Sequence, residues 1–239
     1  MSVRLNRYLS ICGIASRRKA DEMISDSSIA VNGEYVTDLG TRIEPEKDIV
    51  EVNGKIINPE VERYIILNKP RLYLTTLAED NNKKTILELI KDIPQRVYPV
   101  GRLDYDTEGL LFLTNAGSLA NKILHPRNNV PKEYIAIVGG VVDEKALRKM
   151  INGNKLIDGF AKPDKISILK AGKDETILKI VFHEGRNRLV KRYFISFDYM
   201  VKRLKRVGIG SLKLGRLPKG KWRDLTRHEL INLKKSLGL

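Results

Sequence analysis

The sequence predicts an α+β protein in two parts, a small N-terminal module and a larger domain built on a mixed or antiparallel sheet. In the larger part, strand-like runs mostly follow one another, and helical patterns interrupt them without regular alternation. No Gly-rich phosphate loop precedes a helix, which argues against a doubly wound parallel sheet. With 239 residues and 42% hydrophobic content, the chain can bury a core in one or two domains.

The first 60 residues are predicted to form two short helices followed by a small β element. The first helix is indicated by apolar residues at helical spacing, which are Leu5, Tyr8, Leu9 and Cys12. Gly13 ends this pattern, and Ser16 is placed to cap a second helix. Short strands are predicted at 29–31, 35–36 and 49–52, separated by two Asn-Gly turns. Asn58-Pro59 closes the module, so we place its boundaries at residues 1–60.

The larger domain, residues 61–239, is predicted from runs of alternating and helical hydrophobicity. Strand-like runs occur at 64–67, 110–114, 133–138, 166–169 and 176–182. Helical patterns occur at 85–93, 118–123, 144–151, 189–197 and 227–237. Because strands mostly adjoin strands, these elements predict one α+β domain.

Positive charge is concentrated near the C-terminus. The chain has a formal charge of +15, and residues 179–239 contain 17 Lys and Arg against 4 Asp and Glu. The first twenty residues contain five basic residues and no acidic ones. A solubilising face is the alternative explanation, but such asymmetry in a folded chain favours binding to a nucleic acid. We therefore expect two basic surfaces, one in each part of the chain.

Several classes of protein are excluded by composition. No stretch approaches the roughly 20 apolar residues that span a bilayer, and the N-terminus lacks the apolar core of a signal peptide. Cys12 is the single cysteine, and three histidines are too few for a Cys/His zinc cluster. These features predict a cytoplasmic protein without membrane attachment, disulfides or a metal site. No oligomerisation stripe is evident, which predicts a monomer.

The segment from Pro99 to Asn115 places three acids, Asp104, Asp106 and Glu108, between two strand-like runs. A calcium loop is one interpretation, but its twelfth position is Asn115 and a strand-like run follows instead of a helix. In a structural interpretation, the acids cap a turn at Gly109 and pair with Arg102 and Arg71. In a third, an Asp is the reactive carboxylate of a basic nucleic-acid cleft.

Several motifs in this order resemble pseudouridine synthases of the RsuA/RluB type, preceded by a module like that of small-subunit ribosomal protein four. In the module they are SRRKADEMI and Val31-Asn-Gly33. In the larger domain they are Leu67-Asn-Lys-Pro70, GRLDYDTEGLL from Gly101, His125-Pro126, Lys132-Glu-Tyr134 and EGRNRLVKR from Glu184. The resemblance covers nearly the whole chain. It implies the pseudouridine synthase fold behind an alpha-L RNA-binding domain.

The resemblance implies four catalytic residues. Asp104 corresponds to the catalytic aspartate, and Arg102 to the residue that displaces the target nucleotide and fills the gap. Tyr134 corresponds to the tyrosine that stacks on the flipped uracil, although a strand tyrosine alone is more often a core residue. Lys191 falls where the family pairs an Arg or Lys with the aspartate. The sequence departs from the family at Leu189, where Gln or Glu is common, and at Lys191, which lacks the bidentate fork of Arg.

The chemistry agrees with these residue types. Isomerising uridine to pseudouridine needs no external reactant, so no cofactor or metal is implied. The carboxylate acts as a nucleophile or as a base, and a cation beside it keeps it ionised in a desolvated pocket. We therefore predict that Lys191 lies close to Asp104. His125 is predicted to be a turn residue instead of a proton shuttle, and Asp106, Glu108 and Thr107 are predicted to be structural.

The implied partner is ribosomal RNA or a ribosome-assembly intermediate. RNA contacts are predicted for Arg4, Arg17, Arg18, Lys19, Arg186, Arg188, Lys202, Arg203, Lys205 and Arg206. The EGRNR and HPRNNVPKEY stretches favour the RluB branch and 23S ribosomal RNA. The 16S RNA is the alternative, because the chain lacks the long basic extension that is common in the RluB branch. A noncatalytic RNA-binding assembly factor is the rival from another functional class.

Overall fold

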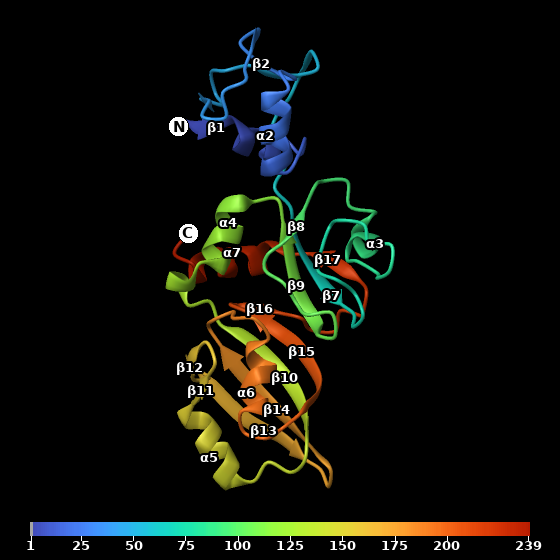
Figure 1. The fold of residues 1–239 in the computed structure, drawn as a ribbon, viewed down its shortest axis with the longest axis vertical. Helices are drawn as coiled ribbons and strands as arrows, with labels where there is room; N and C mark the ends of the chain where they lie inside the picture. The colour runs from blue at the N-terminus through green and yellow to red at the C-terminus, as the bar shows by residue number, and fades with distance from the viewer. Residues whose placement is uncertain (1) are drawn as a thin grey trace. The chain divides into compact units, whose positions relative to one another are not determined.

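The computed structural model describes residues 2–239, which form two compact units (Figure 1). The first unit extends to Arg63 and also contains Pro94–Arg96 and Asn115–Gly117. The second unit contains Tyr64–Ile93, Val97–Thr114 and Ser118–Leu239. None of the helices in this described part of the chain is long and apolar enough to cross a bilayer.

The first unit contains the two predicted helices and a small sheet. The helices are α1 (Leu5–Ile11) and α2 (Arg17–Ser25), and Ser16 Oγ caps α2 by accepting a hydrogen bond from Lys19 N at 3.2 Å. One sheet has the order β3-β2-β5-β6, formed by Glu34–Tyr35, Ile29–Val31, Val50–Val52 and Lys55–Ile56. A separate pair joins β1 (Val3–Arg4) to β4 (Arg42–Ile43). The strands β1, β4 and β6 were not predicted, because two-residue strands carry no periodic signal.

Both Asn-Gly turns of this unit have the predicted geometry. Asn32 and Gly33 have φ angles of 53° and 84°, and Asn53 and Gly54 have φ angles of 51° and 73°. Two consecutive positive φ angles are typical of the turns that match the twist of antiparallel strands. The turns therefore fix the register of β2 with β3 and of β5 with β6.

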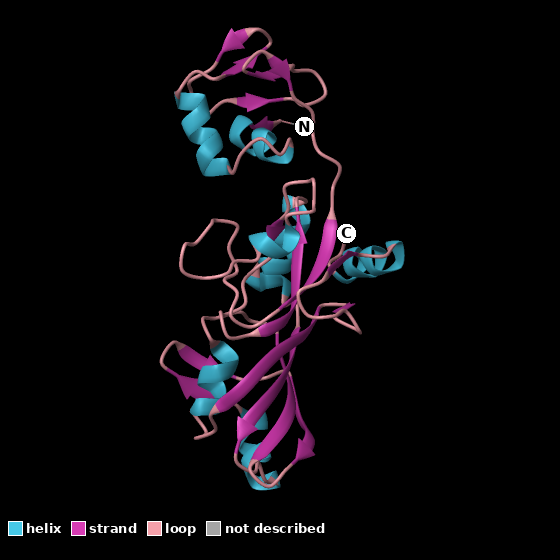
Figure 2. Ribbon diagram, turned by 90° about the vertical axis from the view of Figure 1, so that its right-hand side faces the viewer, coloured by secondary structure: helices cyan, strands magenta, loops and turns pink. Residues whose placement is uncertain are grey.

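A nine-stranded sheet forms the framework of the second unit (Figure 2). Its main path has the order β13-β14-β10-β15-β9-β7-β17, and β16 and β8 pair at the sides of β15 and β9. The strands are β7 (Tyr64–Lys69), β8 (Tyr98–Pro99), β9 (Glu108–Thr114), β10 (Lys132–Gly139), β13 (Lys165–Ala171), β14 (Glu175–Phe182), β15 (Val201–Ile209), β16 (Leu212–Lys213) and β17 (Trp222–Asp224). The β15 and β9 pair is parallel and the others are antiparallel, so the predicted mixed sheet is confirmed.

The helices of this unit form at the predicted places. They are α3 (Leu87–Ile90), α4 (Gly117–Leu124), α5 (Glu144–Asn152), α6 (Leu189–Ile195) and α7 (Arg227–Ser236). The first is shorter than predicted, and Pro94, which has no N–H to donate to the Ile90 carbonyl four residues earlier, limits its C-terminal end. The α6 side chains Tyr193 and Phe194 are fully buried against Leu178 and Ile180 of β14. A short hairpin, β11 (Asn154–Leu156) and β12 (Gly159–Ala161), follows α5.

The sequence pattern suggested a turn at Gly109, but the chain does not turn there. Gly109 lies within β9 with a φ of +111°, and a Cβ atom there would lie 2.1 Å from the Arg206 carbonyl oxygen. Glycine is required because β15 passes so close to β9 at this point. The residue therefore holds the two central strands together beside the acidic segment.

Glu229→Gln is expected to lower the free energy of unfolding by about 1–3 kcal/mol at pH 7, because it weakens charge-assisted hydrogen bonds. Arg223 Nη1 and Nη2 each donate to the Glu229 carboxylate at 2.7 Å, and Thr226 N donates to it at 2.9 Å. The hydrogen bonds from Arg223 are the main cause that lowers the Glu229 pKa from 4.5 to about 2.

The sign of the pH dependence follows from this lowered pKa. The Glu229 contribution is fully present above about pH 4.5 and is lost as the pH falls towards 2. Urea unfolding of wild type and Glu229→Gln is therefore expected to give a smaller difference at pH 3 than at pH 7. An equal difference at both pH values would contradict this assignment.

Candidate active site

The acidic loop, residues 100–107, joins β8 to β9 and is held by hydrogen bonds from the segment after β7. Thr75 Oγ1 donates to the Leu103 carbonyl at 2.7 Å and accepts from Leu103 N at 3.2 Å. Leu72 N donates to the Tyr105 carbonyl at 2.7 Å. These bonds fix the backbone on both sides of Asp104, so the position of Asp104 in the loop does not depend on a ligand.

Lys69, at the end of β7, is a fully buried cation beneath the acidic loop. Its Nζ donates to the carbonyls of Pro70 and Asp104 at 3.1 Å and of Thr107 at 3.0 Å. Burial lowers the Lys69 pKa to about 8, and the charges of Asp104 and Asp106 oppose this effect. Lys69 therefore links the strand to the loop that carries the acids.

The acids meet a second cation, Lys191, which projects from α6. Its Nζ lies 3.6 Å from Asp104 Oδ2, and it forms a closer hydrogen bond with Asp106 Oδ1. The Lys191 side chain is 7% exposed and that of Asp104 is 30% exposed. The predicted proximity of Lys191 and Asp104 is thus present, but Lys191 is shared with an acid whose contact was not predicted.

Asp106 is held in its ionised form by this sharing. Burial raises its pKa, but the hydrogen bond and charge of Lys191 outweigh burial, so the pKa lies below its usual value. Among residues 2–239, Lys191 pairs with both loop aspartates, and Arg203 and Lys219 pair with Glu108 at the start of β9. The structural interpretation that paired them with Arg102 and Arg71 was therefore wrong.

Asp104 lines a pocket of about 680 Å³ in the second unit. Tyr134 reaches it from β10, and Arg102 reaches it from the acidic loop. Tyr134 is half-buried and also packs against two hydrophobic clusters, so it contributes to the core and to the pocket. Arg102 is exposed. The pocket therefore brings together the predicted Asp104, Arg102 and Tyr134, while Lys191 pairs with Asp104 but is not among the lining residues.

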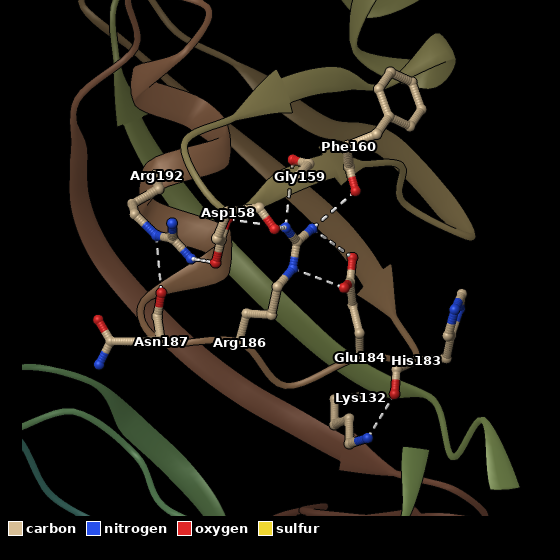
Figure 3. Close-up of polar contacts among 9 residues, drawn as sticks. All are labelled: Lys132, Asp158, Gly159, Phe160, His183, Glu184, Arg186, Asn187 and Arg192. Carbon is tan, nitrogen blue, oxygen red and sulfur yellow. Dashed lines mark hydrogen bonds and ion pairs between the residues drawn. The ribbon is translucent and has the colours of Figure 1, made fainter. Parts of the chain in front are cut away.

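Arg186, predicted to contact RNA, instead joins two protein segments beside the pocket (Figure 3). Its Nη1 donates to Asp158 Oδ1 at 2.9 Å, and its Nη2 donates to the Phe160 carbonyl at 3.0 Å and to Glu184 Oε1 at 3.0 Å. Arg192 Nη2 contacts the other Asp158 oxygen at 2.6 Å. Nε lies 2.8 Å from Glu184 Oε2 in an ion pair whose angle is too poor for a hydrogen bond, so the charge of Arg186 is paired with protein carboxylates and Arg186 has a positioning role for the 158–160 turn.

Arg188 remains exposed at the pocket and adopts a left-handed backbone conformation with a φ of 48°. It precedes α6, and its charge contributes to the lowered pKa of Asp106. A non-glycine residue in this region is strained, and such strain is common at functional sites. Arg188 is therefore available to a ligand, unlike Arg186.

The basic run 202–206 lies on β15, which the sequence did not predict to be a strand. Lys202 and Arg203 are exposed, with Lys202 Nζ 3.4 Å from Glu175 and Arg203 Nη2 3.3 Å from Glu108. Arg206 is only 5% exposed and lines the pocket. The run 202–206 was predicted to form a solvated face that contacts phosphates. Arg206 is not part of such a face, because the alternation of side chains along a strand turns it towards the protein interior. Lys205 is half-buried on the opposite face.

The predicted basic residues of the first unit are all exposed. Arg4 precedes α1, and the other three, Arg17, Arg18 and Lys19, form the first turn of α2. Lys19 Nζ contacts Glu22 at 2.7 Å. Cations at a helix N-terminus are electrostatically unfavourable, so this cluster is not explained by helix stability.

Two further sequence interpretations are resolved by the local structure. His125 caps a short 3-10 helix, Pro126–Asn128, with its Nδ1 accepting from Arg127 N at 3.2 Å, as expected of a turn residue. The acidic loop is followed by β9 and not by a helix, which excludes the EF-hand arrangement. Within residues 2–239, no cluster of three or more His, Cys, Asp or Glu could hold a metal ion.

The sequence matches the family model for RNA pseudouridylate synthases over residues 63–196 and the S4 domain model over residues 3–50. The first match spans more than half of the chain and contains the acidic loop, Tyr134 and Lys191. The chain belongs to the RNA pseudouridylate synthase family. The pseudouridine synthases are isomerases, so the predicted enzyme class is confirmed.

Relatives of this pseudouridine synthase are similar to it over most of their length. An uncharacterized RNA pseudouridine synthase of Aquifex aeolicus is 57% identical over 240 residues, covering 100% of this chain and 96% of that protein. The ribosomal large subunit pseudouridine synthase B of Bacillus subtilis is 41% identical, covering 97% and 95%. The dual-specificity RNA pseudouridine synthase RluF of Escherichia coli is 39% identical, covering 98% and 79%.

A solved structure of a pseudouridylate synthase superposes on this chain with a TM-score of 0.69 and 28% identity. The match covers 97% of this chain and 99% of that one. The predicted pseudouridine synthase fold is therefore confirmed.

Proposed function

We propose that this enzyme isomerises a specific uridine of ribosomal RNA to pseudouridine, with Asp104 as the reacting carboxylate. The observation that carries this proposal is that Asp104 lines the same pocket as Tyr134 and forms an ion pair with the buried Lys191. Two relatives at 41% and 39% identity are named as ribosomal large subunit and dual-specificity RNA pseudouridine synthases, which supports an RNA substrate.

The reaction exchanges one bond to the ribose for another. The N1–C1′ bond breaks with its electron pair left on the uracil, the ring turns, and a C5–C1′ bond forms. The proton on C5 leaves and N1 gains a proton, so the product is an isomer. Asp104 can serve as the nucleophile, or as the base that removes a ribose proton, because a carboxylate performs either role when it is kept ionised.

The uracil must leave its stack to reach Asp104, which costs a few kcal/mol. We assign Tyr134 to stack on the flipped ring, and Arg102 to occupy the vacated position, because it is exposed at the pocket. We assign Arg188, which is exposed at the pocket, to the adjacent RNA backbone. The remaining phosphate contacts are assigned to exposed cations, which are Arg4, Arg17, Arg18, Lys19, Lys202 and Arg203.

Among ribosomal RNAs we propose the large-subunit RNA, 23S, as the substrate of a monomeric, cofactor-free enzyme. The EGRNR and HPRNNVPKEY stretches and the name of the Bacillus subtilis relative support this choice. The small-subunit RNA is the competing substrate in the test below.

The test is tritium release from ribosomal RNA transcripts that carry uridine labelled at C5, with wild type and Asp104→Asn compared on each RNA. Release occurs only when the ribose attachment moves to C5. We expect release by wild type from large-subunit RNA, and sequencing of the product would then locate the modified uridine. Release from small-subunit RNA alone would overturn the choice of substrate. No release from naked RNA or from assembly intermediates would favour a noncatalytic RNA-binding factor.

A further inference from the structure

We propose that Arg206 recognises the uracil of the target nucleotide, with its guanidinium Nη2 donating a hydrogen bond to a uracil carbonyl oxygen. This inference rests on the proposed function. It assigns Arg206 to the base itself and not to phosphates, and it gives the pocket a charged group that acts on the uracil while Asp104 acts on the bonds to the ribose.

The position of Arg206 follows from the register of the central strands. Arg206 of β15 is the direct partner of Tyr134 in β10 on one side and of Gly109 in β9 on the other. Directly paired residues of neighbouring strands project from the same face of a sheet. The guanidinium therefore lies beside the tyrosine that is assigned to stack on the uracil, and both residues line the same pocket.

The hydrogen bonding of this buried guanidinium is incomplete. Arg206 is 5% exposed, and its Nε donates to the Leu110 carbonyl at 2.8 Å, which anchors it to β9. Its Nη2 is buried and has no hydrogen-bond partner among residues 2–239. Thr107 Oγ1, also buried and unpartnered within the same residues, lines this pocket too. Buried polar groups are nearly always paired, so an unpaired donor at a pocket wall indicates a ligand.

Depth distinguishes a base from a phosphate as the ligand. The phosphates of a flipped nucleotide stay on the continuous RNA backbone, whereas the ring enters the pocket. A side chain that is 95% buried beside Tyr134 is therefore placed for the ring. Among the edge groups of uracil, only the carbonyl oxygens O2 and O4 accept hydrogen bonds, and Nη2 is a donor that cannot accept one.

The charge around Arg206 suits the electron flow of the reaction. A second cation, Lys132, lines the pocket, and its Nζ donates to the His183 carbonyl at 2.7 Å (Figure 3). Burial, followed by the charge of Arg206, lowers the Lys132 pKa to about 8. When the N1–C1′ bond breaks, its electron pair spreads over N1, O2 and O4 of the uracil. A fixed cationic donor at one of these oxygens stabilises that charge.

The test uses an RNA fragment that contains the uridine that the wild-type enzyme is found to modify. That position carries uridine, 2-thiouridine or 4-thiouridine. Sulfur accepts hydrogen bonds more weakly than oxygen, so wild type is expected to lose about tenfold or more in single-turnover rate with one of the two thio-fragments. Arg206→Met is expected to be about 100-fold slower on uridine, with RNA affinity within about threefold of wild type. It should show little further loss with the thio-fragment, and Arg206→Lys should be intermediate.

The matched control is Lys179→Met, which removes a cation from the opposite face of the same sheet, where Lys179 contacts Glu133 at 2.7 Å. It should keep the wild-type rate and the wild-type sensitivity to sulfur. Equal sulfur sensitivity in wild type and Arg206→Met would overturn the proposal and leave Arg206 a structural anchor for Leu110. If Arg206→Met does not fold, wild type alone decides, because insensitivity to both thio-fragments overturns the proposal. Absence of wild-type turnover on any RNA would instead refute the proposed function.

Discussion

Asp104→Asn is expected to reduce pseudouridine formation by more than about 10⁴-fold, because a neutral amide can neither attack the substrate nor remove a proton from it. The amide has nearly the size of the carboxylate, whose Oδ2 lies 3.6 Å from Lys191 Nζ, so the substitution removes the charge of the ion pair with little change in shape. The backbone of the acidic loop is held by Lys69 and Thr75 through carbonyl and amide groups that the substitution leaves in place. RNA affinity should therefore change by less than about threefold.

Asp106→Asn is the matched control for this prediction. It removes a carboxylate from the same loop that contacts the same lysine, but its side chain is not among those that line the pocket. We expect a rate within about tenfold of wild type. Tritium release measures turnover and filter binding measures RNA affinity, so the two assays on the same transcript separate loss of catalysis from loss of binding. Equal loss of activity in both variants would mean that the acids act only by holding Lys191, and retained activity of Asp104→Asn would exclude Asp104 as the reacting group.

Elements with a local signal were predicted from the sequence. The second helix begins where Ser16 can cap it, and the two Asn-Gly pairs form the turns that their left-handed preference requires. Short apolar runs such as 110–114 became central strands, here β9, because a strand in the middle of a sheet is buried on both faces and so short a run favours a strand over a helix. These features depend on neighbours in the chain, so a single sequence contains them.

The strand β15 was not predicted, because its signal is tertiary. Its sequence, VKRLKRVGI, contains four cations, which are typical of a solvated segment. In the folded protein β15 occupies the centre of the sheet, where Arg203 contacts Glu108 at 3.3 Å and Arg206 donates to the Leu110 carbonyl. These partners are about a hundred positions away in the chain. The burial of a charge by distant partners leaves no local pattern, which is why Arg206 was assigned to a phosphate-contacting face.

The candidate site was predicted unevenly for the same reason. Asp104, Tyr134 and Lys191 were found through motifs. The fold brings Asp104 and Tyr134 to one pocket and pairs Lys191 with Asp104. Lys69 belongs to a quoted motif but received no role, because a lysine at the end of a strand is usually exposed and its partners here, the Asp104 and Thr107 carbonyls, lie 35 and 38 positions away. The contact of Asp106 with Lys191 depends on the placement of α6, which no local pattern reveals.

Lys191→Met is the second substitution with a large expected effect, a reduction in turnover of about 100- to 1,000-fold. The lysine is nearly fully buried and is the cation shared by Asp104 and Asp106. Its removal leaves two neighbouring carboxylates without their directly paired cation, and the charges of Lys69 and Arg188 act only from farther away, which favours protonation of the pair. The acid limb of the pH–rate profile is therefore expected to move to higher pH, and activity should partly recover at alkaline pH.

Lys191→Arg separates charge from geometry at the same position. Arg keeps the positive charge and offers a bidentate fork, which the family carries at this position by the resemblance, so we expect a rate within about tenfold of wild type. Its acid limb should stay at the wild-type pH. A merely structural role for Lys191 would lower thermal stability in Lys191→Met without moving the pH profile. If Lys191→Met shows that result, the cation only fills space beneath the loop. If the profile moves and Lys191→Arg restores it, the cation keeps the reacting carboxylate ionised.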